Sequence, residues 1–279
     1  MFFKSFTLAA FIFLPINTLF SQEIILTDEK ENYKLYENMI YYEDTTGKLN
    51  IDDIKKIDKA IFTRGTSKIP NLGMTKSSWW VYFKIKNNST KQKWVLIFDN
   101  MYTDIWELYS SSSSGEKIFK TGGNSFPFSQ REIENRKLNT FLPTEYGKST
   151  EYYIKTKGQT DFSLPFYIQT EAWLYKENVS DENNYFLYFG IIATLVVFNL
   201  FIFFMLKDVT YLFYILATSA FALMATYHTG LSYQYFYSDH PWIQKNFDTI
   251  AALPYIGFGL PPFFRTRFRQ HFSFQTTPD

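Results

Sequence analysis

The stretch FLYFGIIATLVVFNLFIFFML, residues 186–206, constrains the fold more than any other part of the chain. No charged residue lies between Glu182 and Lys207, and only Thr194 and Asn199 interrupt the apolar run. About 20 apolar residues allow an α-helix to cross the hydrocarbon core of a bilayer. A core helix of a soluble protein usually keeps a polar stripe. The segment is therefore predicted to span a membrane.

Two further apolar stretches follow the first one. Residues 211–227 carry no charge, and residues 249–264 carry none either but contain three prolines. Membrane helices tolerate proline where neighbouring groups satisfy the freed carbonyls, so a third span is predicted here. The segment KDVT, residues 207–210, is long enough only for a tight turn between the first two helices.

Residues 1–21 have the features of a secretory signal peptide. Lys4 precedes a short apolar run, and Ser21 lies where cleavage is expected. An uncleaved anchor helix is the alternative, although the apolar run is short for a span.

The outer loop 228–246 holds Lys245 as its one lysine or arginine, and arginines follow the third span in RTRFRQHF. This distribution predicts that residues 22–178 lie outside the cytoplasm.

Residues 22–178 are predicted to form one β-rich domain. In WVYFKIK, residues 80–86, Val81, Phe83 and Ile85 alternate with polar or amphipathic side chains, which is typical of a half-buried strand. Six more short strands are expected at residues 93–100, 104–110, 116–121, 138–143, 151–157 and 164–170. Turn sequences such as NNSTK and TGGN separate them, and the serine run 110–114 is read as a hairpin tip. This rhythm predicts an all-β, jelly-roll-like sandwich followed by an α-helical membrane region.

One amphipathic helix is expected before these strands. Isoleucines recur at helical spacing, at Ile51, Ile54, Ile57 and Ile61. Asn50 with Asp53 supplies a capped start. The helix is predicted to pack on the sandwich, and binding to a partner is the alternative.

The order of these features resembles a known family. The most specific pieces are SSWWVYFKIKN and the helix pair YFGI…LFIFFMLKDVTYLFY, and the resemblance covers roughly residues 35–272. The chain resembles the bacterial seven-transmembrane receptors with diverse intracellular signalling modules, specifically their type 2 extracellular domain joined to the start of the seven-helix domain. The resemblance implies a jelly-roll sensor that binds carbohydrate or a related small ligand. It also implies a multi-pass protein of the bacterial inner membrane with its N-terminal domain in the periplasm.

The chain departs from the family pattern after its third predicted helix. Residues 185–272 hold only the first three of seven helices, and the sequence stops at FSFQTTPD. Three explanations stay open: a fragment, an early-ended reading frame, or a protein that works in truncated form. A cytoplasmic signalling domain missing from this chain is therefore an expected partner, alongside the ligand and the lipid bilayer.

No catalytic motif is present in the sequence. Cysteine is absent, the three histidines follow no metal-ligand spacing, and the hydrolase, metalloprotease and phosphate-loop signatures do not occur. No enzymatic activity and no cofactor are therefore expected. The net charge of +1 gives no reason to expect a nucleic-acid partner.

Ligand binding is the remaining predicted role of the outer domain. Sugar sites combine aromatic walls with a few polar groups. The candidate ligand-binding residues are Trp79, Trp80, Trp94, Trp106, Arg131 and Arg136. The alternative is that most of these tryptophans belong to the core and that the arginines tie a loop to a strand end.

Three classes of function fit the sequence. A membrane receptor is favoured by the signal peptide, the outer sandwich and the helix pair taken together. A membrane-tethered carbohydrate-binding or adhesion module without signalling output is the alternative. A membrane enzyme or transporter ranks third, because it needs charged or polar groups inside the helices, where this chain has few.

Overall fold

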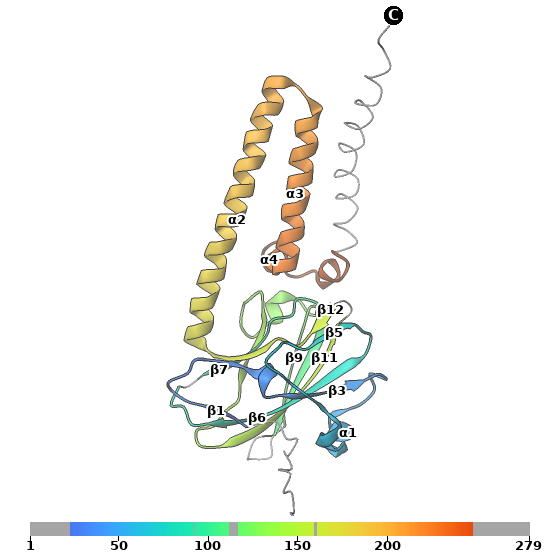
Figure 1. Cartoon of the computed structure of the whole chain (residues 1–279), viewed down its shortest axis with the longest axis vertical. Coiled ribbons are helices and arrows are strands. Elements are labelled where there is room, and N and C mark those ends of the chain that lie inside the picture. The colour runs from blue at the N-terminus through green and yellow to red at the C-terminus, as the bar shows by residue number, and fades with distance from the viewer. Residues whose placement is uncertain (1–22, 92, 112–116, 159–160, 248–279) are drawn as a thin grey trace, which may run out of the picture.

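The computed structural model describes residues 23–247, except residues 92, 112–116 and 159–160. The predicted signal peptide, the third span, the arginine-containing tail and part of the serine run lie outside the described residues. Figure 1 shows a β-domain at one end of the molecule and a helical hairpin that extends away from it.

The β-domain is built from two main sheets. The larger sheet has the strand order β4-β3-β6-β11-β8-β9, and β1 pairs in parallel with β6. Its strands are β1 (Ile24–Leu26), β3 (Ile40–Asp44), β4 (Thr63–Arg64), β6 (Ser78–Asn87), β8 (Thr103–Ser111), β9 (Lys117–Gly122) and β11 (Ser149–Gly158). The smaller sheet has the order β10-β7-β13-β2. Its strands are β2 (Asn32–Lys34), β7 (Trp94–Phe98), β10 (Leu138–Leu142) and β13 (Phe166–Thr170). A separate two-stranded sheet joins β5 (Asn71–Met74) to β12 (Asp161–Ser163).

The main core lies between the two larger sheets. Trp79, Val81, Phe83 and Ile85 of β6 all belong to it, as do alternate residues of β7. The period of two that the sequence shows over residues 80–86 is therefore confirmed, and so is the all-β fold class. All seven expected strands are present, and the sequence reading missed β1, β2, β3, β4, β5 and β12, most of which are very short.

The helix expected over residues 51–61 is shorter in the structure. It forms α1 (Ile51–Lys56), and Asn50 and Asp53 make the expected capping box. Ile57 then has an extended backbone, and Asp58 caps a separate 3-10 turn, η2 (Lys59–Ile61). Ile54 packs with Trp80 on the outer face of the larger sheet. The prediction was wrong for Ile61, whose side chain is 62% exposed because the helix ends before it.

The first membrane helix begins much earlier than the sequence predicted. Helix α2 (Glu171–Leu206) follows β13 without a loop, and the Thr170 hydroxyl caps it by accepting from the Trp173 amide. Leu174 of its first turns is buried against Val95 and Ile97 on the outer face of the smaller sheet. The polar segment before residue 186 is therefore a helical stem that stands on the sandwich.

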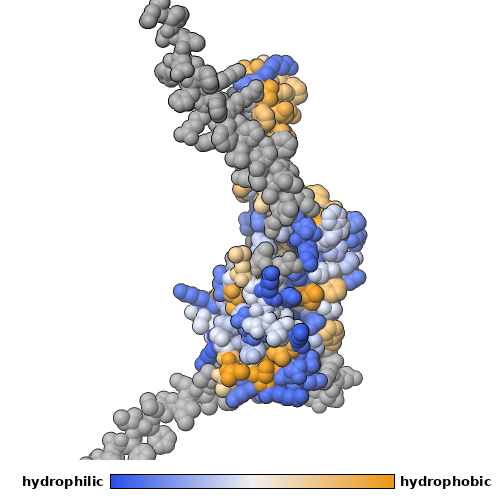
Figure 2. Space-filling model, turned by 90° about the vertical axis from the view of Figure 1, so that its right-hand side faces the viewer, coloured by the Kyte–Doolittle hydropathy of each residue, from blue (hydrophilic) through white to orange (hydrophobic). Residues whose placement is uncertain are grey.

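The predicted tight turn between the first two helices is confirmed. Lys207 adopts a left-handed backbone conformation, with φ of 55°, and the Asp208 side chain caps α3 (Val209–Thr229). Both helices are long and apolar enough to cross a membrane. Figure 2 shows hydrophobic side chains along the distal part of this hairpin. A short helix, α4 (Leu231–Tyr235), and a helical segment over residues 241–247 follow on the side of the β-domain.

Candidate ligand-binding site

A cavity of about 280 Å³ opens between the edge strands of the two sheets. Strands β8 and β9 form one wall, β10 forms the opposite wall, and residues 123–137, here called the β9–β10 loop, close it above. The side chains that line it come from Trp106, Lys120, Thr121, Phe126, Pro127, Gln130, Arg131, Glu132, Leu138, Asn139 and Thr140. The wall combines aromatic and apolar surface with a few polar groups, as small-ligand sites do.

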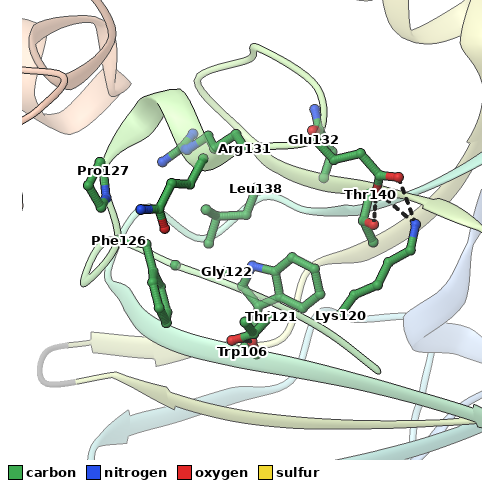
Figure 3. Close-up of a pocket in the computed structure, with 13 residues that line it drawn as sticks. Trp106, Lys120, Thr121, Gly122, Phe126, Pro127, Arg131, Glu132, Leu138 and Thr140 are labelled. Carbon is green, nitrogen blue, oxygen red and sulfur yellow. Dashed lines mark hydrogen bonds and ion pairs between the residues drawn. The ribbon is translucent and has the colours of Figure 1, made fainter. Parts of the chain in front are cut away.

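Trp106 forms the floor of this cavity, and its indole ring lies beside Gly122 in Figure 3. The two residues are paired in register between β8 and β9. A Cβ atom on Gly122 would lie 2.8 Å from Trp106 Nε1, so only glycine leaves room for the indole in this position. The Trp106 N–H has no hydrogen-bond partner among the described residues, and neither does the side-chain amide of Asn139.

A carboxylate joins the two sheet edges at one side of the cavity. Glu132 accepts hydrogen bonds from Lys120 Nζ at 2.8 Å, from the Thr140 hydroxyl and from the Phe141 amide at 3.1 Å. Burial favours the neutral acid, but these hydrogen bonds outweigh it and hold the pKa of Glu132 below its ordinary value of 4.5. Glu132 is therefore charged at neutral pH and fixes the β9–β10 loop to both walls.

Arg131 lies at the roof of the cavity (Figure 3). Its Nη1 donates to the backbone oxygens of Asn135, at 2.6 Å, and Arg136, at 2.9 Å, and its Nη2 donates to Asn124 Oδ1 at 3.2 Å. The guanidinium carbon stands 4.5 Å from the ring centre of Phe128. The β9–β10 loop is thus wrapped around this side chain.

The opposite surface of the β9–β10 loop contacts the segment that follows α3. The Phe128 amide donates to the Ser238 carbonyl at 2.8 Å, and the Ser129 hydroxyl donates to Asp239 Oδ1 at 3.2 Å. The Tyr233 hydroxyl donates to the Phe126 carbonyl, and the centre of the Tyr233 ring lies 5.4 Å from the Arg131 guanidinium. One loop therefore touches the cavity on one side and the segment that follows α3 on the other.

Arg136 bridges α2 and α3 at the ends that lie beside the β-domain. It forms an ion pair with Asp181 on the stem of α2 and donates to the Thr229 carbonyl at the end of α3, at 3.4 Å. Its guanidinium also lies 5.2 Å from the ring centre of Tyr185. Arg136 does not line the cavity. Sequence reasoning grouped it with Arg131 as a ligand candidate, and the structure separates the two positions.

The other three candidate tryptophans lie away from the cavity. Trp79 and Trp94 belong to the core between the sheets, and Trp80 is wholly buried beneath α1 on the opposite face of β6. The indole N–H groups of all three lack a partner among the described residues, as that of Trp106 does. Of the six candidates, only Trp106 and Arg131 line the cavity.

Several residues of the site were not foreseen from the sequence. Lys120, Glu132 and Thr140 meet only because the edges of two sheets face each other, which local sequence does not reveal. The segment FPFSQREIENRK, residues 126–137, supplies most of the roof of the cavity. Its length between two short strands was the sequence feature that could have indicated a functional loop. Within the described part of the chain, no group of histidine and acidic residues could hold a metal ion.

Comparison with known families gives two matches. Residues 37–170 match the model described as 7TMR-DISM extracellular 2. Residues 183–275 match the model described as 7TM diverse intracellular signalling. Between them the two models cover most of the chain and leave a short interval within α2 unmatched. No curated protein matches the chain significantly.

Proposed function

The chain belongs to the bacterial seven-transmembrane receptors with diverse intracellular signalling modules, and we propose that its sensor domain binds a saccharide in the cavity above Trp106. The composition of the cavity wall supports this, because it combines the aromatic side chains of Trp106 and Phe126 with polar side chains such as that of Thr140. A volume of about 280 Å³ suits a ligand of one or two sugar rings at most.

We also propose that the β9–β10 loop relays occupancy of the cavity to the membrane helices. The observation that carries this proposal is the double contact of the loop. It lines the cavity through Arg131 and Glu132. It also contacts α2 and α3 through Arg136, and the segment that follows α3 through Phe128 and Ser129. A ligand that shifts the loop would change these contacts, and a ligand shifts an equilibrium by its differential affinity for the two states.

The cellular setting follows the same proposal. Residues 1–21 act as a signal peptide, residues 22–178 hold the sensor on the periplasmic side of the bacterial inner membrane, and residues 185–272 begin a multi-pass membrane domain. The contacts of the β-domain with the segment after α3 support an arrangement in which both lie on one side of the bilayer. A cytoplasmic signalling partner would receive the output. We propose no catalytic role for the cavity.

Cysteine cross-linking tests the relay, because the natural chain has no cysteine. The Ser129→Cys, Asp239→Cys double variant should form a disulfide, since the two side chains are in hydrogen-bond contact. The full chain in detergent is first screened with mono- and disaccharides for a rise in melting temperature. A stabilising saccharide should then change the cross-linking rate by about fivefold or more. The Ser129→Cys, Thr63→Cys pair is the control, because Thr63 lies on the opposite edge strand of the larger sheet.

Gln130→Trp locates the binding site. Gln130 lines the cavity and is exposed, so a bulky ring there should fill the entrance without disturbing the core. A saccharide that stabilises this variant as strongly as the natural chain binds elsewhere. An unchanged cross-linking rate at saturating saccharide would indicate binding without relay. A panel with no stabilising saccharide would remove the carbohydrate part of the proposal.

A further inference from the structure

The charges around the cavity are unbalanced among the described residues. Two cations and one carboxylate line it: Lys120, Arg131 and Glu132. Lys120 is paired with Glu132 at 2.8 Å and also donates to the Phe141 carbonyl at 2.9 Å. Arg131 has no carboxylate partner among the described residues, so the cavity wall carries an excess positive charge.

The surroundings of Arg131 leave part of its guanidinium unsatisfied. Its Nη1 bonds two backbone oxygens, but its Nε–H has no acceptor among the described residues. Burial lowers the pKa of Arg131 from 12.5 to about 10, although the nearby Tyr233 phenol opposes this shift. The side chain remains charged at neutral pH, and a buried guanidinium is ordinarily paired with an anion. A carboxylate, whose two oxygens match the planar donors of a guanidinium, is the acidic group that sugars carry in uronic acids.

We propose that the ligand of this cavity is an acidic saccharide, a uronic acid in chemical class, whose carboxylate pairs with Arg131. The inference rests on the proposed function, because it takes from there that the cavity binds a sugar. Arg131 lies at the roof and Trp106 at the floor (Figure 3), so the carboxylate points up toward the guanidinium while the ring lies over the indole. Aromatic rings commonly support the apolar face of a bound ligand.

Lys120 does not serve as the counter-ion in this proposal. Its ammonium group already contacts both oxygens of Glu132 and one backbone carbonyl. Pairing a ligand carboxylate with Lys120 would bring that carboxylate beside Glu132, and like charges at short distance repel. Arg131 is the cation at this site whose pairing costs no existing ion pair.

Matched pairs of sugars test the inference on the full chain in detergent. Glucuronate is compared with glucose, and galacturonate with galactose, by isothermal titration calorimetry at low and moderate salt. Within each pair the ring is the same and only the group at C6 differs. The uronate should bind about tenfold or more tightly than the neutral hexose, because a hydrogen-bonded charge pair is gained. Raising the salt concentration should reduce this preference.

Arginine variants assign the effect to one residue. Arg131→Gln should abolish the preference for the uronate, and Arg131→Lys should keep part of it, because it keeps the charge but not the planar donors. Arg64→Gln is the control, because it removes the same charge from an exposed residue of β4, at the far edge of the larger sheet. Arg131 also holds its own loop, so the comparison of sugars on the natural chain remains decisive where Arg131→Gln does not fold.

The possible results separate this inference from the proposed function. Equal affinity for uronates and neutral hexoses would overturn the inference while leaving a saccharide site in place. Failure of both uronates to bind at millimolar concentration would overturn the inference too, and a response to other saccharides in the wider screen would still support the proposed function. A uronate preference that survives Arg131→Gln would show that Arg131 is not the counter-ion.

Discussion

At the scale of single residues, Glu132 is the side chain that joins the two walls of the cavity to its roof. Its folded-state pKa is held below the ordinary value of 4.5, so its charge stabilises the fold. This contribution is fully present above pH 4.5 and is lost as the pH falls through the lower folded-state value. Glu132→Gln should therefore destabilise the chain by about 0.5–1 kcal/mol at pH 7, since the carboxylate is partly exposed.

The measurement is the unfolding of the full chain in detergent at pH 7 and again at pH 3. The difference between Glu132→Gln and the natural chain should be larger at pH 7 than at pH 3, because the stabilising charge is lost progressively as the pH falls below 4.5. Glu134→Gln is the matched control, because Glu134 is an exposed carboxylate of the same loop. A loss of stability that is the same at both pH values would contradict the ionic role of Glu132.

The ligand-binding candidates selected from the sequence coincide with the residues that line the cavity only in part. Sequence reasoning selected Trp106 and Arg131, which line the cavity. It also selected Trp80 and Trp94, which are wholly buried. Residue type alone does not distinguish a tryptophan in a core from one at a cavity floor, because both are large and apolar. The difference for Trp106 depends on Gly122, its cross-strand neighbour, and this pairing appears only once the strand register is known.

At the scale of elements, the stem of α2 is held on the smaller sheet by a buried lysine. Lys137 is 6% exposed and forms ion pairs with Glu177 at 3.0 Å and with Asp99 and Asp181 at 3.5 Å. Burial alone would lower the pKa of Lys137, but these carboxylates outweigh it and raise the pKa. Removing one partner of a buried pair costs about 3–5 kcal/mol when the other is fully buried.

Lys137→Ala should cost less than this, about 2 kcal/mol, because its carboxylate partners are partly exposed. The stem should also open more often. Hydrogen exchange of the backbone amides of residues 172–182 is the direct measurement, and it should become faster relative to the strands of the core. Lys93→Ala is the control, because Lys93 pairs with Glu171 of the same stem but both side chains are 56% exposed. Equal effects of the two variants would contradict the anchoring role of Lys137.

The elements that the sequence predicts well are those whose pattern is long. Strand β6 shows its alternation over residues 80–86, and α2 and α3 show long apolar runs. Strands β1, β2 and β4 have only two or three residues, and their pairing depends on distant partners. The stem of α2 was missed because its polar residues suit an exposed helix as well as a linker. Its helical form is stabilised by the Thr170 cap and by the burial of Leu174.

At the scale of the whole molecule, the β-domain and the segment after α3 lie at the same end of the helical hairpin and contact each other. The contacts of Phe128 with Ser238 and of Tyr102 with His228 both join the β-domain to residues beyond or at the end of α3. The β-domain and residues 230–247 therefore lie together at one end of the hairpin, while the turn at Lys207 lies at the opposite end of both helices (Figure 1). Two helices that each cross the bilayer once produce this arrangement.

This arrangement predicts opposite labelling of two single cysteines. Tyr235→Cys lies in α4, where Tyr235 is 63% exposed, and Lys207→Cys lies at the exposed turn. On bacterial spheroplasts that express the full chain, a membrane-impermeant maleimide should label Tyr235→Cys directly. Lys207→Cys should be labelled only after the membrane is permeabilised. The cysteine-free natural chain provides the background.

Labelling of both positions from the outside would mean that α2 and α3 do not cross the membrane. Labelling of Lys207→Cys alone would mean that the hairpin crosses in the reverse orientation, with the sensor domain in the cytoplasm.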